Sequence, residues 1–472
     1  MQKTKMIFTI GPSSDNEEIL TEFIKIGMNV ARLNFSHGTH ETHKDKIELI
    51  KKIRTNLNTP TAIMLDIKGP KIRTHNFIND GVELEAGQNF TFICDKEILG
   101  DNKSCSITYE ELYKDVNIGG TILVDDGLLS FEIIDIQDKN IICRLLNDGI
   151  IKNHKGVNVP NVSINLPSVT EKDKDDLIFG CKMEVDFIAA SFVRKASDVL
   201  EIRDLLNSNN GKNIQIIAKI ESQEGVNNID PILSVADGIM VARGDMGVEI
   251  PIERVPIIQK NIIKKCNEAG KIVITATQML DSMIRNSLPT RAEACDICNA
   301  IFDGTDAIML SGESASGLYP IEAARTMSKI AKETEAHLDY NYLNQRLKEP
   351  AMYDFAEAIS YSTCRTSNVL NAKAIVAATN SGSTAKLVSK YKPKCPIIAI
   401  TPHSDVMRGL SLNFGVLPVL CQQFATTDDI LTEAKTVVKS LNIAQEGDDI
   451  IVAAGMPTNY TGGTNMLKIE KV

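Results

Sequence analysis

The chain has 472 residues, more than one hydrophobic core usually serves, so roughly two to four domains are expected. Its composition, 43% hydrophobic and 24% charged, is that of an ordinary globular protein. A net charge of −10 and an aromatic content of only 5% argue against a general nucleic-acid surface, which needs clustered positive charge and aromatic rings for base stacking.

Two further features concern the cellular setting. The N-terminal residues run directly into an apolar strand pattern, with no signal peptide, and no apolar run reaches the ~18 residues of a membrane span. The close cysteine pair, Cys295 and Cys298, lacks the second pair that a zinc site needs. We therefore expect a cytoplasmic protein with reduced thiols and with neither membrane nor nucleic acid as a partner.

Short apolar runs alternate with longer amphipathic ones along most of the chain. Eight of these runs are nearly continuous, as is typical of parallel strands covered on both sides. Between them, Val255, Ile258 and Ile262 recur at helical spacing, and Gly270 suits the helix end. The pattern predicts a (β/α)8 TIM barrel, with its active site at the carboxyl ends of the strands. The predicted strands are residues 5–10, 29–34, 61–67, 185–191, 214–220, 238–241, 272–276 and 307–310.

The connection after the third strand breaks this rhythm. Residues 70–166 show strand-like alternation and turn pairs such as Gly119-Gly120 and Asp126-Gly127, which predicts an inserted small β-barrel domain. An insertion here emerges on the active-site face, where it suits a mobile lid that excludes water; an inert decoration is the alternative. The barrel domain then comprises residues 1–69 and 167–340.

A polar link at 341–348 precedes a third domain, residues 352–472, for which a doubly wound α/β fold is predicted. Its strands are expected at 374–377, 397–400, 416–419, 450–453 and 466–472. A loop before a helix expected to begin near Ala385 offers hydroxyl and amide groups for an anion; ordinary helix capping is the alternative. The loop residues are Thr379, Asn380, Ser381, Gly382, Ser383 and Thr384.

A lysine and two carboxylates form the clearest chemical motif. Lys219 and Glu221 close the fifth predicted strand, and Asp245 follows the sixth. Adjacent strand ends can place the two carboxylates side by side, which suits Mg²⁺, and the lysine adds a cation for phosphoryl transfer. Gly244 and Gly247 leave the backbone open to a carboxylate or phosphate.

Other polar side chains follow the remaining strands. An arginine can bind phosphate bidentately, and a carboxylate after a buried run needs a cation or donors. A strand-end threonine can orient water, although it is more often merely hydrogen-bonded. The residues are Arg32, Asn34, Ser36 and His37 at the second strand, Asp66 and Arg73 around the third, Thr275 and Thr277 at the seventh, and Ser311 and Glu313 at the eighth.

Seven segments, in this order, resemble the pyruvate kinase family along nearly the whole chain. They are residues 29–38, 65–70, 155–158, 218–221, 242–247, 276–280 and 309–313. The resemblance implies a barrel A domain, a β-rich B lid and a C-terminal regulatory domain. It also implies transfer of a phosphoryl group from phosphoenolpyruvate to ADP, giving pyruvate and ATP, by a homotetramer.

The resemblance implies a role for each matching residue. Glu221 and Asp245 would hold Mg²⁺ or Mn²⁺, and Lys219 would stabilise charge on the phosphoryl group and the enolate. Arg32 would bind the substrate phosphate, while Thr277 and the backbone of Gly244 and Asp245 would bind its carboxylate. A water near Thr277 and Ser311 would protonate the enolate. The nucleotide-contacting positions are Asn34, His37, Arg73 and Lys155.

One departure concerns potassium. Many members of the family bind K⁺ through oxygens that match Asn34, Ser36, Asp66 and the carbonyl of Ile67. Those members carry glutamate where this chain has Lys71, and threonine where it has Ile67. We hypothesise that the Lys71 ammonium replaces K⁺; a solvent-facing lysine is the alternative.

Regulation and two competing functions stay open. The loop at 379–384 resembles the family's effector-phosphate loop, opposite residues 455–465, but its uncharged side chains do not choose between a sugar phosphate and AMP. A Mg²⁺-dependent aldolase or phosphoenolpyruvate mutase is the first alternative, although an insertion carrying Arg73 and Lys155 has no purpose without a nucleotide. An inactive, metabolite-binding paralogue is the second, although the matching catalytic residues are all present.

Overall fold

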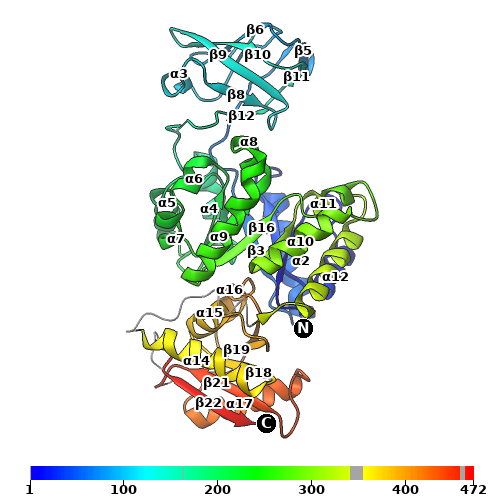
Figure 1. Cartoon of the computed structure of the whole chain (residues 1–472), viewed down its shortest axis with the longest axis vertical. Helices are drawn as coiled ribbons and strands as arrows, with labels where there is room; N and C mark the ends of the chain where they lie inside the picture. Colours follow the sequence, from blue (N-terminus) through cyan, green and yellow to red (C-terminus); the bar gives the residue numbers. More distant parts are fainter. Residues whose placement is uncertain (1, 163, 341–353, 458–462) are drawn as a thin grey trace.

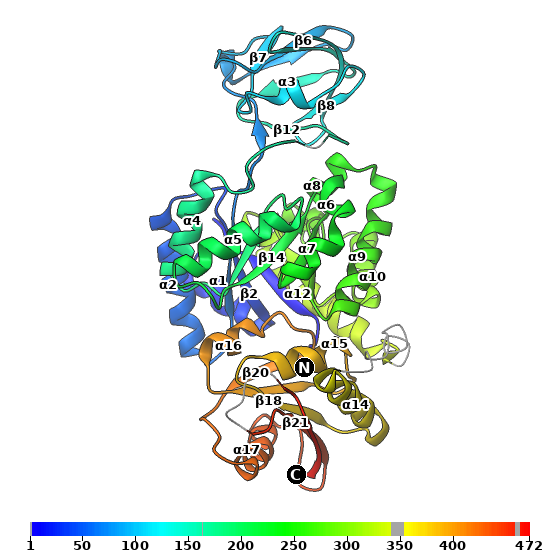
Figure 2. The ribbon, with the colours of Figure 1, turned by 90° about the vertical axis from the view of Figure 1, so that its left-hand side faces the viewer.

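The computed structural model describes residues 2–162, 164–340, 354–457 and 463–472. Eight parallel strands close into a barrel in the order β1-β17-β16-β15-β14-β13-β3-β2, which confirms the predicted TIM barrel. Helices surround it, with a small β domain above and a third domain below (Figures 1 and 2). The strands are β1 (Lys5–Thr9), β2 (Met28–Asn34), β3 (Ala62–Asp66), β13 (Phe187–Ala190), β14 (Gln215–Ile220), β15 (Gly238–Ala242), β16 (Ile272–Ala276) and β17 (Ala307–Leu310). The main outer helices are α1 (Glu17–Ile26), α2 (His40–Asn56), α4 (Glu171–Lys182), α5 (Ala196–Ser208), α7 (Ile229–Val235), α9 (Val255–Ala269), α10 (Arg291–Asp303) and α12 (Pro320–Ala336).

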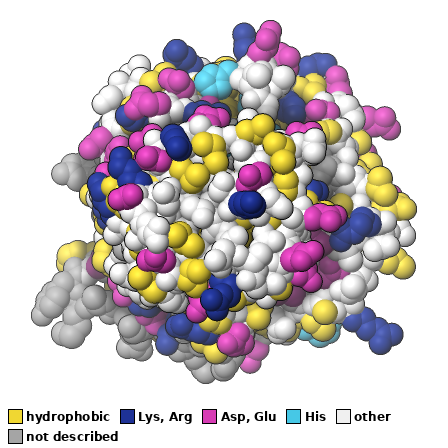
Figure 3. Space-filling model, turned by 90° about the horizontal axis from the view of Figure 1, so that it is seen from above, with side chains coloured by type: hydrophobic (Ala, Val, Ile, Leu, Met, Phe, Trp, Pro, Cys, Tyr) yellow, Lys and Arg dark blue, Asp and Glu magenta, His cyan; other side chains and the backbone are white. Residues whose placement is uncertain are grey.

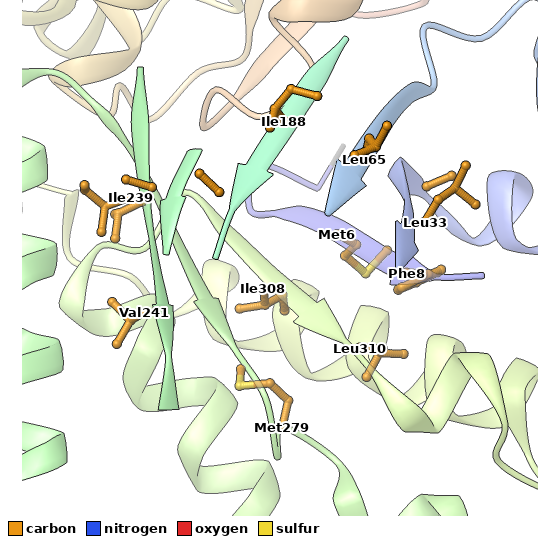
Figure 4. Close-up of a cluster of buried hydrophobic side chains, with 14 of the residues drawn as sticks. Met6, Phe8, Leu33, Leu65, Ile188, Ile239, Val241, Met279, Ile308 and Leu310 are labelled. Carbon is orange, nitrogen blue, oxygen red and sulfur yellow. The ribbon is translucent and has the colours of Figure 1, made fainter. Parts of the chain in front are cut away.

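Side chains of the barrel strands alternate between two hydrophobic cores. Met6, Phe8 and Leu65 belong to the large core between strands and helices, part of which Figure 4 shows. The residues between them along each strand point into the barrel, because successive side chains of a strand face opposite ways. The inner cluster is Ile7, Val30, Ala62, Met64, Phe187, Ala189, Ile217, Met240, Ile272, Ile274, Ala276, Ala307, Met309 and, from the third domain, Leu412.

The lid is a curled seven-stranded sheet in the order β4-β12-β8-β9-β10-β6-β7 with a two-stranded sheet, β11-β5, beside it. Buried Phe90, Phe92 and Phe131 pack at 5.1–5.4 Å between ring centroids in its own core. Seen from this end of the molecule, Lys and Arg side chains are interspersed with Asp and Glu (Figure 3). The strands are β4 (Ile72–Arg73), β5 (Gly81–Leu84), β6 (Asn89–Ile93), β7 (Ser104–Ser106), β8 (Thr121–Val124), β9 (Leu129–Gln137), β10 (Asn140–Leu145), β11 (Gly149–Lys152) and β12 (Gly156–Asn158).

The third domain is a five-stranded sheet in the order β20-β19-β18-β21-β22, whose last strand is antiparallel to its neighbour. Helix α15 (Ser383–Lys390) begins two residues before the predicted Ala385, because Gly382, with φ +87°, turns the chain into the helix earlier. The other elements are α14 (Phe355–Leu370), β18 (Ala374–Ala378), β19 (Ile397–Thr401), α16 (Ser404–Gly409), β20 (Val416–Leu420), α17 (Thr427–Ser440), β21 (Asp449–Ala454) and β22 (Met466–Lys471).

The predicted polar link at 341–348 lies outside the described residues. We propose the limits 1–69 with 167–340, 70–166 and 352–472 for the three domains. Within the described ranges, no helix is both long and apolar enough to cross a membrane.

Buried ion pairs join the barrel to the third domain. Asp306 precedes β17; its Oδ2 accepts a hydrogen bond from the Val273 amide at 2.9 Å, and its Oδ1 lies 2.5 Å from Lys392 Nζ. Asp186 makes the same pair of contacts with the Ile63 amide at 2.8 Å and with Arg408 Nε at 2.6 Å. Each carboxylate thus accepts a hydrogen bond from a backbone amide of a barrel strand and pairs with a cation of the third domain.

Replacing Lys392 with methionine tests this junction. Lys392→Met would leave the Asp306 carboxylate buried without its cation, which is expected to lower the free energy of unfolding by about 3–5 kcal/mol. The measurement is denaturant unfolding followed through the third domain. The control is Lys265→Met, since the pair of Lys265 with Asp230 is solvent-exposed and should matter by less than about 1 kcal/mol. Equal midpoints for the two variants would contradict the argument.

Candidate active site

The inward rows of the barrel end in polar side chains at the carboxyl ends of the strands. Along β14, Ile217 faces the interior and Lys219 and Glu221 continue the same row. A site therefore lies at the barrel mouth beneath the lid, as expected for this fold. The corresponding residues on the neighbouring strands are Thr9 after Ile7, Arg32 after Val30, Asp66 after Met64 and Ser191 after Ala189.

Lys219 is the centre of this cluster. Its Nζ lies 2.6 Å from Ser191 Oγ, 3.1 Å from Asp66 Oδ1 and 3.2 Å from Glu221 Oε1. The residue is 8% exposed, so burial alone would lower the pKa of Lys219; Asp66 and Glu221 outweigh burial and raise it. Lys219 is therefore a fixed, buried cation at neutral pH.

Arg32 is the second buried cation. Its Nε lies 2.6 Å from Asp66 Oδ2, and its Nη1 donates to Thr9 Oγ1 at 2.9 Å. Burial would raise the pKa of Asp66, but Arg32 and then Lys219 hold that pKa below its usual range. Asp66 thus stays ionised and orients both cations.

Glu221 and Asp245 fit a divalent metal ion. Glu221 is 1% exposed; its Oε2 accepts from the Phe192 amide at 2.6 Å, whereas its Oε1, although close to Lys219, has no hydrogen bond. Burial and the nearby charge of Asp245 raise the pKa of Glu221, although Lys219 opposes them. Two converging carboxylates, one with an unbonded oxygen, are what Mg²⁺ uses when its other ligands are water and phosphate. No group of three or more His, Cys, Asp or Glu side chains suited to a metal occurs in the described part of the chain.

Lys71 contacts the carboxylate of Asp245. Its Nζ lies 3.0 Å from Asp245 Oδ1 and 3.4 Å from Asp126 Oδ1 of the lid. Lys71 is thus placed at the expected metal ligand and not, among the described contacts, on any of the predicted potassium ligands. It links the lid to α8 (Arg243–Glu249), the helix that carries Asp245.

Thr277 is held in a strained conformation beside α8. Its φ is +68°, which is rare for a β-branched residue. Its Oγ1 accepts from the Gly244 amide at 2.7 Å, while Arg243 donates to the carbonyls of Ala276 and Thr277 at 3.2 and 2.6 Å. These bonds fix the hydroxyl over the first turn of α8.

Ser311 and Glu313, both expected at the end of the eighth strand, differ in their surroundings. Glu313 is 2% exposed and accepts from the amides of Ser311 and Leu280 at 2.7 and 3.0 Å, so it supports the backbone. Ser311 itself is partly exposed. Thr275, considered with Thr277, faces away from the barrel and donates to Thr305 Oγ1 at 3.0 Å.

The predicted nucleotide residues come from two sides. Asn34 and His37 lie at the end of β2 and in the following loop, where Asn34 Oδ1 accepts from the Ser36 amide at 3.1 Å. Arg73 and Lys155 belong to the lid: Arg73 Nη1 donates to the His154 carbonyl at 2.8 Å, and Lys155 Nζ lies 2.9 Å from Asp125.

The predicted effector loop is held by a hydrogen bond at each end. The Gly382 amide donates to Thr379 Oγ1 at 2.9 Å, and Thr384 Oγ1 lies 2.8 Å from Thr464 Oγ1. The second bond joins it to the segment expected opposite, of which residues 458–462 lie outside the described ranges.

Sequence reasoning missed Ser191, Thr9 and Arg243. Ser191 and Thr9 could have been found from strand alternation alone, because each follows an inward apolar residue by two positions. Arg243 carries no comparable pattern, since its role comes from the strained turn at Thr277. Ser191 also donates to the carbonyl of Ile67 at 2.7 Å, so it joins Lys219 to the residue that follows β3.

A closed parallel barrel with buried cations and carboxylates at its mouth, beneath a separate inserted domain, is the arrangement expected of a metal-dependent phosphoryl-transfer enzyme. Known proteins agree with this class. The family models "Pyruvate kinase, barrel domain" and "Pyruvate kinase, alpha/beta domain" match residues 1–324 and 357–470. Pyruvate kinases of Clostridium perfringens and Clostridium acetobutylicum are 68% and 58% identical over the whole of both chains. The crystal structure of a pyruvate kinase from Cryptosporidium parvum is 41% identical, with a TM-score of 0.95 over 100% of this chain and 96% of that one.

The chain belongs to the pyruvate kinase family. Enzymes of this family are phosphotransferases that transfer the phosphoryl group of phosphoenolpyruvate to ADP in the last step of glycolysis; they use a divalent metal ion, and many of them also use potassium. The resemblance stated from the seven sequence segments is confirmed.

Proposed function

We propose that this chain carries out the family's reaction at the barrel mouth, with Lys219 as its central catalytic residue. The observation that supports this most is the buried contact of Lys219 Nζ with Asp66, Ser191 and Glu221. A cation fixed in a site shielded from water stabilises developing negative charge without reorganisation. Lys219 would face the transferring phosphoryl group and the enolate that departs from it.

Arg32 would bind the substrate phosphate, because Asp66 and Thr9 already hold its guanidinium in place. Thr277 and the backbone at Gly244 and Asp245 would bind the substrate carboxylate. The strained Thr277 backbone is consistent with a functional placement of that hydroxyl.

Glu221 and Asp245 would hold Mg²⁺, or Mn²⁺ in its place. A metal ion bound there would supply positive charge to the phosphate and enolate oxygens. The unbonded Oε1 of Glu221 supports this assignment. Asp245 would exchange its contact with Lys71 for the ion.

The nucleotide would lie between the barrel and the lid, against Asn34, His37, Arg73 and Lys155. Closure of the lid would exclude water from the transfer. The enolate would then take its proton from a water held near Thr277 and Ser311. We expect the enzyme in the cytoplasm, where ADP and phosphoenolpyruvate are supplied.

Removing the Lys219 ammonium tests the central assignment. Lys219→Met should lower kcat by about 10²–10³, the usual effect of losing one preorganised donor. ADP-dependent pyruvate formation measured by a coupled assay gives the value. The matched control is Lys5→Met: Lys5 is also buried, at 3% exposure, but lies at the opposite end of the barrel. The assignment fails if both folded variants keep wild-type kcat.

The potassium requirement is the second test. We propose that Lys71, once Mg²⁺ occupies Asp245, supplies the charge that K⁺ supplies elsewhere in the family. Activity in tetramethylammonium buffer should then change little on adding KCl. Lys71→Glu should make activity depend on KCl by about tenfold or more, equivalent to ~1.4 kcal/mol of lost charge neutralisation. A large KCl activation of the wild-type enzyme would exclude the substitution of K⁺ by Lys71.

We also propose that the loop at 379–384 binds a phosphorylated effector, a sugar phosphate or AMP, and that the enzyme is a homotetramer. Phe355 and Val369 of α14 are 83% and 81% exposed in the single chain. Such apolar side chains on the third domain would be covered by another copy of the chain in a tetramer, which supports the proposal.

Phosphoenolpyruvate saturation curves with and without each effector test this regulation. The right effector should shift half-saturation by about fivefold or more. Ser383→Asp should abolish that shift by repelling phosphate, whereas Ser440→Asp, on the exposed end of α17, should not. Unshifted curves would count against an effector site, and sedimentation at the mass of one chain would count against the tetramer.

A further inference from the structure

The loop after β2 is held by a buried histidine that no role so far accounts for. His43 lies in the first turn of α2, is 5% exposed and stacks on Phe35 with ring centroids 3.9 Å apart and planes at 10°. Its Nε2 lies 2.8 Å from the carbonyl oxygen of His37. Since a carbonyl can only accept, Nε2 carries the proton.

The imidazole is neutral and tightly surrounded. Burial lowers the pKa of His43, and its Nδ1 is buried without a hydrogen-bond partner. A Cβ on Gly38, which has φ +80°, would lie 3.3 Å from Nε2, so the loop wraps closely around the ring. Few other side chains could fill this space and donate to the same carbonyl.

A second set of hydrogen bonds, from Lys172 of α4, holds the loop at Phe35. Lys172 of α4 donates to the Phe35 carbonyl at 2.8 Å and to Asp176 at 2.7 Å. Asp176 in turn lies 2.7 Å from His40 Nε2. The carbonyls of Phe35 and His37 are therefore both bonded to donors from outer helices.

Two of the residues proposed to bind nucleotide belong to this segment: Asn34 directly precedes Phe35, and His37 is itself one of the two anchored residues. Asn34 is the last residue of β2 and still pairs with Asp66, whereas Ser36 and His37 lie beyond β2, where the barrel's backbone bonds no longer hold the chain. The Phe35 amide makes the last such bond, to the Asp66 carbonyl at 2.9 Å. A loop that binds a ligand must be ordered beforehand, or binding carries the cost of ordering it.

We propose that His43 is a positioning residue for ADP: through Phe35 and the His37 carbonyl it fixes the loop that presents Asn34 and His37 to the nucleotide. This inference rests on the proposed nucleotide site. It assigns to His43 no contact with substrate and no proton transfer. Its effect should be confined to nucleotide affinity, because Arg32 on β2 and Lys219 on β14 are held by strand pairing and by Asp66, not by the loop.

Two substitutions separate the stacking from the hydrogen bond. His43→Phe keeps an aromatic ring against Phe35 but cannot donate, and should raise KM for ADP about tenfold, the scale of one net hydrogen bond. The kcat at saturating ADP and the KM for phosphoenolpyruvate should each stay within about twofold. His43→Gln, which regains an N–H donor, should return KM for ADP to within about threefold of wild type. The control, His337→Phe, changes an exposed histidine directly after the last residue of α12 and should alter none of these values.

Phe35→Leu tests the contact between Phe35 and His43 by changing the other partner, and it replaces His43→Phe if that variant does not fold. It removes the stack, leaves the imidazole, and should raise KM for ADP selectively. The substitutions at Phe35 and His43 are together called the clamp variants. The proposal is overturned if the folded variants leave KM for ADP unchanged, or if KM for both substrates rises together with a lowered melting temperature.

Asn34→Ala distinguishes this failure from failure of the nucleotide site. If Asn34→Ala raises KM for ADP while the clamp variants do not, the site stands and the role of His43 is excluded. If neither does, both are excluded.

Discussion

The structure of the site depends on a buried set of alternating charges at the barrel mouth. Arg32, Asp66, Lys219 and Glu221 follow one another around three strand ends, each within contact distance of an opposite charge. None of them could be removed from water alone, since an unpaired buried charge costs several kcal/mol. Among the carboxylate oxygens of this set, only Oε1 of Glu221 has no hydrogen bond, although Lys219 Nζ lies 3.2 Å from it.

Such an arrangement contributes little to stability. Replacing a buried ion network by packed apolar side chains is often neutral or stabilising, so its retention argues for function. The ion pairs at the opposite end of the barrel differ, because Asp186 and Asp306 each also cap the backbone of a neighbouring strand. The same barrel therefore has buried carboxylates in an ion network beneath the inserted domain at one end and in the docking of the third domain at the other.

The sequence predicted the eight strands, the inserted β domain and the charged residues at the strand ends, because parallel strands are long apolar runs and their last inward residues are polar. It did not predict the contacts of Lys71, whose position depends on how the lid lies over α8. Nor did it identify Leu412, which belongs to the core inside the barrel although it comes from the third domain. Both depend on the packing of domains distant in the chain, which hydrophobic periodicity does not encode.

Strand-borne and loop-borne residues of the site are fixed by different means. Lys219 lies on β14, which pairs with β13 and β15 and whose first residue, Gln215, contacts Lys386 and the Gly409 carbonyl of the third domain at 3.0 and 2.7 Å. Its position follows from the barrel itself. His37 lies beyond the barrel's backbone bonds, and its carbonyl is held by His43 of an outer helix, whereas the side chain of Asn34, the last residue of β2, accepts a hydrogen bond from the Ser36 amide of the same loop. The proposed site would need both kinds of support, since a metal ion and a phosphate would require rigid charges whereas a nucleotide would have to enter and leave beneath the inserted domain.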